Sequence, residues 1–241
     1  MTLKAIVWDW EGTLVDEGEQ LFQARKYVAE SAQRIGYKTS FPYSNKQEML
    51  EQMLPPKEEY EKFGFHFKTD VNTIKDLFAA GINNTPAKTY TFSKDLLEFT
   101  KQLGFINVLV SNKQKKYLEK EVQNQGLTQY FEVILGSGDF TKLKPDFEGI
   151  QKALDALRLM AEEIIIIGDS VGEIRMAKTH NAKIISVTWG LGKTNELKEE
   201  KASFYATNPQ ELKNVLTLIK KMDSLPQREA KPMKMNKDYT I

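Results

Sequence analysis

The 241-residue chain contains no cysteine and only two histidines. Without cysteine there is no disulfide, no thiolate metal site and no cysteine nucleophile. Two histidines exclude a metal site made of three histidines. The longest apolar runs, Ala5–Trp8 and Ile164–Ile167, are far too short to span a membrane. Any chemistry must therefore depend on carboxylates, hydroxyl groups, lysines or a bound metal.

The charged residues are almost balanced. The chain has 34 Lys and Arg against 33 Asp and Glu, which gives a net charge of +1. This balance argues against a protein dedicated to binding nucleic acid or a membrane surface. The first residues turn acidic after one short apolar run, unlike a secretory signal peptide. We therefore expect a cytoplasmic protein, monomeric or homodimeric, that acts on a small molecule.

Five short apolar runs predict the strands of a buried sheet. They are Ala5–Trp8, Val108–Val110, Ile164–Ile167, Ile184–Val187 and, more weakly, Val133–Leu135. Their continuous apolarity is typical of parallel strands that are covered on both faces. Helical patterns lie between and after them, at residues 92–103, 112–125, 147–157, 170–179 and 209–222. This alternation predicts a doubly wound, Rossmann-like α/β core with a parallel sheet.

An extra segment separates the first strand from the second. Nearly 100 residues lie between them, whereas a βαβ unit needs only about 30. We predict a core at residues 1–16 and 89–222, an all-α cap at 17–88 inserted after the first strand, and a polar, flexible tail at 223–241. Apolar residues at helical spacing mark the first cap helix, namely Leu21, Ala24, Val28, Ala32 and Ile35. Further cap helices are expected at 46–54, 56–63 and 71–80.

Polar residues follow the predicted strands, where a parallel sheet binds its ligands. Asp9 and Glu11 follow the first strand, Ser111 and Asn112 the second, Lys144 comes after the third along the chain, and Asp169 and Glu173 follow the fourth. Acids gathered at one sheet edge need a cation. Mg²⁺ is suited to such a site, because it prefers oxygen ligands and binds through a few carboxylates together with a phosphate.

This set of residues predicts phosphoryl transfer. With a metal shielding the repulsion, Asp9 can attack a phosphate ester and form an aspartyl-phosphate, which water then hydrolyses. Ser111, expected at a helix start, and Lys144, expected as a mobile cation, would neutralise the phosphoryl oxygens. Glu11, two residues from the nucleophile, would protonate the leaving group.

The motifs together resemble the haloacid dehalogenase superfamily, in its phosphoglycolate-phosphatase-like branch with a helical cap. They are Asp9-x-Glu11-Gly12-Thr13, Ser111-Asn112-Lys113, Lys144-Pro145 and Gly168-Asp169-Ser170-x-x-Glu173. The resemblance covers residues 1–16 and 89–222. It implies that Asp9 is the nucleophile, that Glu11 is the acid and base, and that Ser111, Asn112 and Lys144 bind the phosphoryl group. It also implies Mg²⁺ at Asp9, Asp169 and the carbonyl of Glu11, supported by Glu173.

Two departures from the family pattern leave alternatives open. The family's phosphatases usually have Asp at the position of Glu11 and commonly Asp at that of Glu173. Each added methylene extends the acid by about 1.3 Å, and a misplacement of about 1 Å can slow a reaction on the order of 100-fold. Besides a Mg²⁺-dependent phosphatase of a small metabolite, the sequence therefore allows an impaired member that binds a phosphometabolite or a protein. A phosphomutase is the third possibility.

Overall fold

The core of the protein is a six-stranded parallel sheet. The computed structural model describes residues 2–52, 54–85 and 88–224. The strands are β1 (Ala5–Trp8), β2 (Ile106–Gln114), β3 (Val133–Ser137), β4 (Ile164–Gly168), β5 (Lys183–Val187) and β6 (Phe204–Ala206). Their order is β3-β2-β1-β4-β5-β6, so β1 lies between β2 and β4. The predicted doubly wound α/β fold is confirmed.

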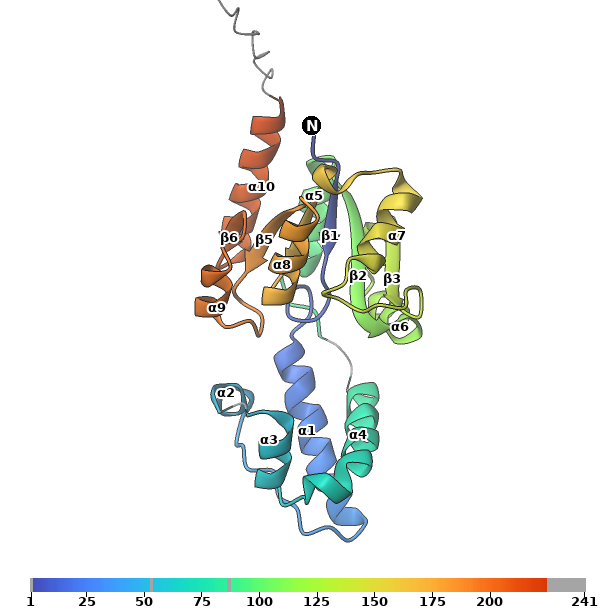
Figure 1. The fold of residues 1–241 in the computed structure, drawn as a ribbon, viewed down its shortest axis with the longest axis vertical. Helices are drawn as coiled ribbons and strands as arrows, with labels where there is room; N and C mark the ends of the chain where they lie inside the picture. The colour runs from blue at the N-terminus through green and yellow to red at the C-terminus, as the bar shows by residue number, and fades with distance from the viewer. Residues whose placement is uncertain (1, 53, 86–87, 225–241) are drawn as a thin grey trace, which may run out of the picture.

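Helices cover both faces of the sheet (Figure 1). Ile6 and Trp8 of β1 face α5 (Ser93–Gln102), α6 (Lys115–Asn124) and α10 (Pro209–Ser224). Ala5 and Val7 face the other layer, formed by α7 (Glu148–Leu157), α8 (Val171–Thr179) and α9 (Thr194–Glu199). Alternate side chains of a strand point to opposite faces, so two helical layers explain why the strand sequence is apolar without interruption.

One strand, β2, extends well beyond its prediction, and another, β6, was missed. β2 continues through Asn112–Gln114, which the sequence analysis assigned to the following helix, and Gln114 pairs with Ser137 of β3. The register shifts between Val110 and Gln114, so these polar residues are extended without a continuous ladder. β6 pairs with β5 but lacks the β-branched residues on which the strand predictions were based.

Four helices between β1 and α5 build a core of their own below the sheet (Figure 1). They are α1 (Glu17–Arg34), α2 (Lys46–Glu51), α3 (Pro56–Lys62) and α4 (Phe67–Asn84). Aromatic residues including Tyr43, Tyr60 and Phe63 fill this core, and an ion pair of 2.9 Å joins Arg25 to Glu59 inside it. The assignment of residues 17–88 to a separate cap domain stays a prediction.

The end of the first cap helix differs from its prediction. Ile35 was placed on the apolar face of that helix, but α1 ends at Arg34 and the Ile35 residue is 61% exposed. Its N–H donates to the carbonyl of Ala32 at 3.1 Å, which closes the last turn and directs the side chain away from the core. Apolar spacing alone therefore placed this helix terminus one residue too late.

The last helix includes the first residues assigned to the tail. The side chain of Asn208 caps α10 by accepting a hydrogen bond of 2.9 Å from the N–H of Glu211, as the Asn-Pro sequence predicts. α10 then runs to Ser224, and Asp223 accepts a 2.8 Å hydrogen bond from the N–H of Leu3. Residues 225–241 of the predicted tail lie outside the described residues. No helix within the described ranges is both long and apolar enough to cross a membrane.

Candidate active site

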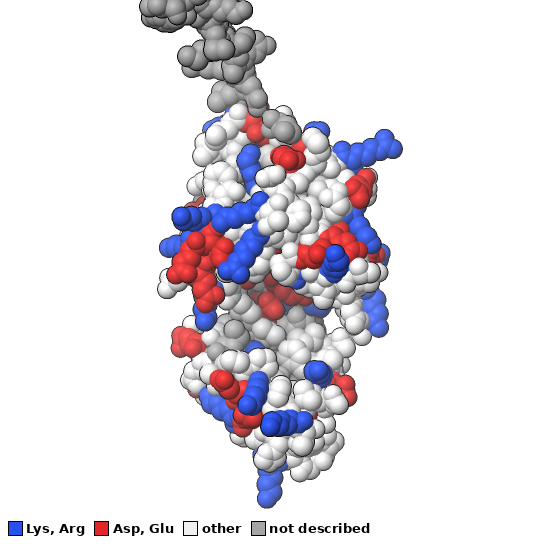
Figure 2. Space-filling view, viewed as in Figure 1, with Lys and Arg blue, Asp and Glu red and all other residues white. Residues whose placement is uncertain are grey.

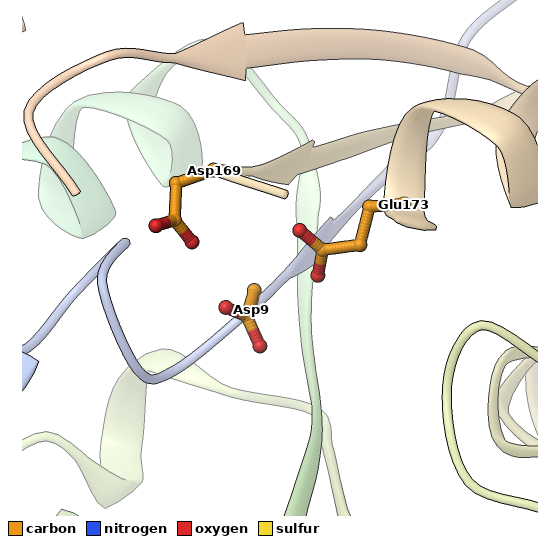
Figure 3. Close-up of side chains that lie close together, drawn as sticks. All are labelled: Asp9, Asp169 and Glu173. Atoms are coloured by element: carbon orange, nitrogen blue, oxygen red, sulfur yellow. The ribbon is translucent and has the colours of Figure 1, made fainter. Parts of the chain in front are cut away.

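Three carboxyl groups meet at the carboxyl end of the sheet. Asp9 follows β1, Asp169 follows the neighbouring β4, and Glu173 lies in the first turn of α8. One oxygen from each lies within 4.8 Å of the other two, and the side chains converge on a common space (Figure 3). The structure thus brings together three of the predicted metal ligands, and their role as ligands stays a prediction.

Asp169 is held by main-chain donors and enclosed by glycine. Its Oδ2 accepts hydrogen bonds from the N–H groups of Leu191, at 2.8 Å, and Gly192, at 3.3 Å. A Cβ atom on Gly12 would lie only 2.4 Å from the same oxygen, and Gly12 also has a φ of +76°, so glycine is needed there. Burial raises the pKa of Asp169 to about 6, and the charge of Glu173 adds to this rise.

Asp9 is almost enclosed at the centre of the acids. The residue is 8% exposed, and its N–H donates to the carbonyl of Ile167 at 2.9 Å, which fixes the main chain between β1 and β4. Burial raises the pKa of Asp9 well above its ordinary value, and the charge of Glu173 raises it further, against the opposing effect of Lys144. An ionised Asp9 therefore needs a nearby cation.

Among the described residues, Lys144 provides the cation next to Asp9. Its Nζ donates to Oδ1 of Asp9, and to Oε1 of Glu173 at 2.7 Å. Burial alone would lower the pKa of Lys144, but the charges of Asp9 and Glu173 outweigh it and raise that pKa above its ordinary value. The expectation of a mobile cation is wrong for this arrangement, because the side chain is only 11% exposed and is bound to two acids.

Asn112 binds the main chain of Lys144. Its Oδ1 accepts the N–H of Lys144 at 2.7 Å, and its Nδ2 donates to the carbonyl of Lys144 at 3.1 Å. This pair of hydrogen bonds fixes the loop from which the lysine enters the site. Asn112 therefore orients Lys144, and direct contact between Asn112 and a phosphate stays a prediction.

The carboxylate of Glu173 is shared between a helix cap and the site. Its Oε2 accepts the N–H and the hydroxyl of Ser170, at 3.2 and 2.9 Å. The hydroxyl of Ser170 in turn accepts the N–H of Glu173 at 3.3 Å, which completes a capping box at the start of α8. The longer arm of Glu thus reaches both this cap and Lys144.

Glu11 reaches from the loop after β1 to β2. Its Oε2 accepts the hydroxyl hydrogen of Ser111 at 2.7 Å, and its Oε1 lies 3.2 Å from Nζ of Lys113. Ser111 is fully buried within β2, so the predicted position at a helix start is wrong. The error arose because the polar residues after Ser111 were assigned to a helix, which in fact begins at Lys115.

Lys113 is a site residue that the sequence analysis left without a role. Besides Glu11, its Nζ contacts Oε1 of Glu121 at 2.8 Å and Oε1 of Gln20 at 3.4 Å. Residues two apart on an extended chain point to the same side. The extension of β2 therefore places Lys113 on the same side of the strand as Ser111. The sequence would have indicated this position only if residues 112–114 had been predicted as part of the strand.

A cavity of about 740 Å³ lies between the sheet and the helices α1 and α4. Its floor holds the acids and lysines described above, and acidic side chains are visible within the hollow in Figure 2. The cap side is lined by Glu17, Gln20 and Leu21 of α1 and by Phe78 and Ile82 of α4. Neither histidine lines this cavity. The arrangement places these acids at the bottom of a pocket whose other wall comes from the helical segment.

The donor set at the floor is suited to Mg²⁺. The three converging groups offer only hard oxygen atoms, which are the ligands that Mg²⁺ prefers. The pKa of Asp9 and that of Asp169 are raised by burial and by neighbouring acids, so the site has more negative charge than Lys144 balances. A divalent cation fits both the atoms and the charge.

The chain is similar to known phosphatases in sequence and to a known hydrolase in structure. A phosphoglycolate phosphatase of Vibrio parahaemolyticus is 24% identical over 224 residues, 90% of this chain and 97% of the relative. A pyrophosphatase PpaX of Bacillus cereus is 22% identical over 223 residues, 90% and 98% of the two chains. A haloacid dehalogenase-like hydrolase structure from Streptococcus pneumoniae, 22% identical, superposes with a TM-score of 0.68 over 88% of this chain and 98% of that one.

The profile of the haloacid dehalogenase-like hydrolases matches residues 6–187. This match spans β1 to β5 and includes every residue predicted for the site. The resemblance that the motifs indicated is thus confirmed, and the chain belongs to the haloacid dehalogenase-like hydrolase family.

Proposed function

We propose that the chain is a Mg²⁺-dependent phosphatase that hydrolyses a small phosphorylated metabolite through an aspartyl-phosphate on Asp9. The observation that carries this proposal is the meeting of Asp9, Asp169 and Glu173 within 4.8 Å, with Lys144 bound to two of them at the floor of a cavity. A carboxylate nucleophile in a site with metal-binding acids and a lysine is equipped for phosphoryl transfer.

The proposed reaction has two steps. In the first, an oxygen of Asp9 forms a bond to phosphorus, the bond from phosphorus to the ester oxygen breaks, and Glu11 gives its proton to the departing alkoxide. In the second, Glu11 takes a proton from water, and the resulting hydroxide attacks phosphorus. This releases inorganic phosphate and restores the carboxylate of Asp9.

The remaining residues orient and neutralise the phosphoryl group. Lys144 and the hydroxyl of Ser111 would bind its oxygens, which requires Ser111 to exchange its hydrogen bond with Glu11 for one with the substrate. Asp9, Asp169 and Glu173 would hold Mg²⁺. When bound, Mg²⁺ supplies positive charge that allows a carboxylate to approach an anionic ester.

The names of relatives support a small phosphate compound as the substrate. The relatives named above are a phosphoglycolate phosphatase and a pyrophosphatase, and both names denote small phosphate compounds. We propose that α1 and α4 contact the leaving group, since they form the wall opposite the acids. Closure of these helices over the substrate would exclude water during the first step.

Release of phosphate from p-nitrophenyl phosphate tests the proposal directly. Hydrolysis is expected with Mg²⁺ and should stop when EDTA removes the metal and return when Mg²⁺ is restored. No release from this ester or from a panel of metabolite esters, with Mg²⁺ present, would favour a binding protein instead. Conversion of one sugar phosphate to its isomer, with little free phosphate, would indicate a phosphomutase.

The acid role of Glu11 predicts a loss that depends on the leaving group. We expect Glu11→Gln to lower kcat/KM about 100-fold for an alkyl phosphate, because kcat/KM reports the first step and general acid catalysis contributes at least this much to it. The loss should be much smaller for p-nitrophenyl phosphate, whose leaving group needs no proton. Equal losses with both esters would show that Glu11 acts in another way, for example by positioning Ser111.

A further inference from the structure

The cap side of the cavity is mainly apolar. Leu21 of α1 and Phe78 and Ile82 of α4 line it, which is suitable for the carbon skeleton of a leaving group. The amide of Gln20 is already engaged, because its Nε2 donates to the carbonyl of Thr85 at 3.2 Å and to Glu121 at 3.4 Å, and its Oε1 accepts from Lys113. This leaves the carboxyl group of Glu17 as the polar group that a leaving group meets on this wall.

The carboxyl group of Glu17 is unpaired. Within the described part of the chain it forms no hydrogen bond and no ion pair. Its pKa is raised to about 7, first by burial and then by the charges of Glu11 and Asp169, against the smaller effects of Lys113 and Arg25. Glu17 is partly buried and lines the cavity. A partly buried acid without a partner is costly for folding, so its position against the cavity indicates a role toward a ligand.

The cations around the cavity have partners already. Among the described residues that line it, the cationic side chains are Lys113 and Lys144. Lys113 contacts Glu11 and Glu121, and Lys144 contacts Asp9 and Glu173, where the phosphoryl group is expected. On the next turns of α1, Arg25 is paired with Glu59 inside the cap. Among the described residues, the leaving-group side of the cavity therefore has no uncommitted cation that could bind a second anionic group.

We propose that Glu17 is a specificity-determining residue that rejects leaving groups with a second anionic group. The preferred substrates are then phosphate monoesters whose leaving group carries hydroxyl groups on an uncharged carbon skeleton. The apolar wall contacts the skeleton, and the carboxyl group of Glu17 accepts a hydrogen bond from a hydroxyl. A site can select one substrate by placing like charge against its competitor. This inference rests on the proposed phosphatase activity and narrows it to a substrate class.

Two matched pairs of esters test the inference. Glycerol 3-phosphate and 3-phosphoglycerate differ by a hydroxymethyl group in place of a carboxylate, and so do 2-hydroxyethyl phosphate and phosphoglycolate. At about pH 8.5, where an acid with a pKa of about 7 is ionised, we expect kcat/KM to favour the uncharged member of each pair by about tenfold or more, because like charges at short range in a partly buried site repel each other. A preference for 3-phosphoglycerate and phosphoglycolate would overturn the inference.

The variant Glu17→Gln removes the charge and keeps the shape. It should reduce the preference within each pair about tenfold, mainly through a gain in kcat/KM for the carboxylate esters. Glu19→Gln is the matched control, because Glu19 lies on the same turn of α1, contacts Gln23 and does not line the cavity. This control should keep both the preference and the rate with p-nitrophenyl phosphate.

The outcomes separate this inference from the proposed function. If p-nitrophenyl phosphate and all four esters are inert with Mg²⁺, the phosphatase proposal fails and the inference fails with it. If the esters are hydrolysed but Glu17→Gln changes neither ratio, the phosphatase proposal stands and the specificity role of Glu17 is rejected.

Discussion

Replacing Asp9 with asparagine is expected to lower kcat/KM for every phosphate ester by on the order of 10⁴-fold or more, because the amide cannot act as the nucleophile. The change is nearly isosteric, and the N–H of residue 9 can still donate to the carbonyl of Ile167. The main chain between β1 and β4 should therefore be preserved. Initial rates with p-nitrophenyl phosphate and Mg²⁺ measure the effect.

A control variant separates lost chemistry from lost structure. Asp95→Asn alters a carboxylate whose side chain is 64% exposed and which pairs with Lys213 on the core surface. This variant should keep the rate of the unmodified enzyme. Asp9→Asn should also keep its melting temperature, since burial opposes the ionised form of Asp9. An active Asp9→Asn enzyme would contradict the proposed nucleophile.

Replacing Lys144 with methionine is expected to lower kcat/KM by about 10²- to 10³-fold, the loss typical when one charge-stabilising group is removed from an active site. The methionine side chain fills similar space but leaves Asp9 and Glu173 without their shared cation. Rates at saturating Mg²⁺ should be compared, so that a change in metal affinity is not mistaken for a change in chemistry.

Lys142→Met provides the matched comparison for Lys144. The side chain of Lys142 lies in the same loop but is 71% exposed and faces Asp146 at 3.8 Å. Its loss should change the rate by less than about twofold, as is usual for exposed charges. Similar losses in both variants would mean that the loop as a whole, and not the buried Nζ, determines activity.

The strands with the clearest sequence signals carry the acids of the site. Ala5–Trp8 and Ile164–Ile167 are continuous apolar runs because helices cover both faces of the sheet. The residues that follow them, Asp9 and Asp169, were expected at one edge because parallel strands present their carboxyl ends together. The arrangement of these two acids was therefore predictable from the sequence.

The extension of β2 was not predictable from local composition. Asn112, Lys113 and Gln114 are polar and lack β-branching, which is more typical of a helix than of a buried strand. They are extended because Asn112 binds the main chain of Lys144, and because Gln114 pairs with β3. Both contacts join segments distant in sequence, so no pattern within this segment indicates them.

The cap side of the cavity depends on helix packing. The apolar spacing in α1 predicted a helix, but the spacing does not show that Glu17 and Leu21 line the cavity while Val28 is buried within the core of the helical segment. The contact of α1 with α4 and its direct connection to the loop after β1 decide this orientation. The role proposed for Glu17 could therefore arise only from the structure.

Trapping the aspartyl-phosphate tests the central proposal most directly. The enzyme is mixed with a phosphate ester and Mg²⁺ and quenched with sodium borohydride, which reduces an acyl phosphate to an alcohol and so converts the modified aspartate to homoserine. Peptide mass spectrometry should find homoserine at position 9, only when substrate is present. Homoserine at another aspartate, or ester hydrolysis with no change at position 9 at any quench time, would contradict the account.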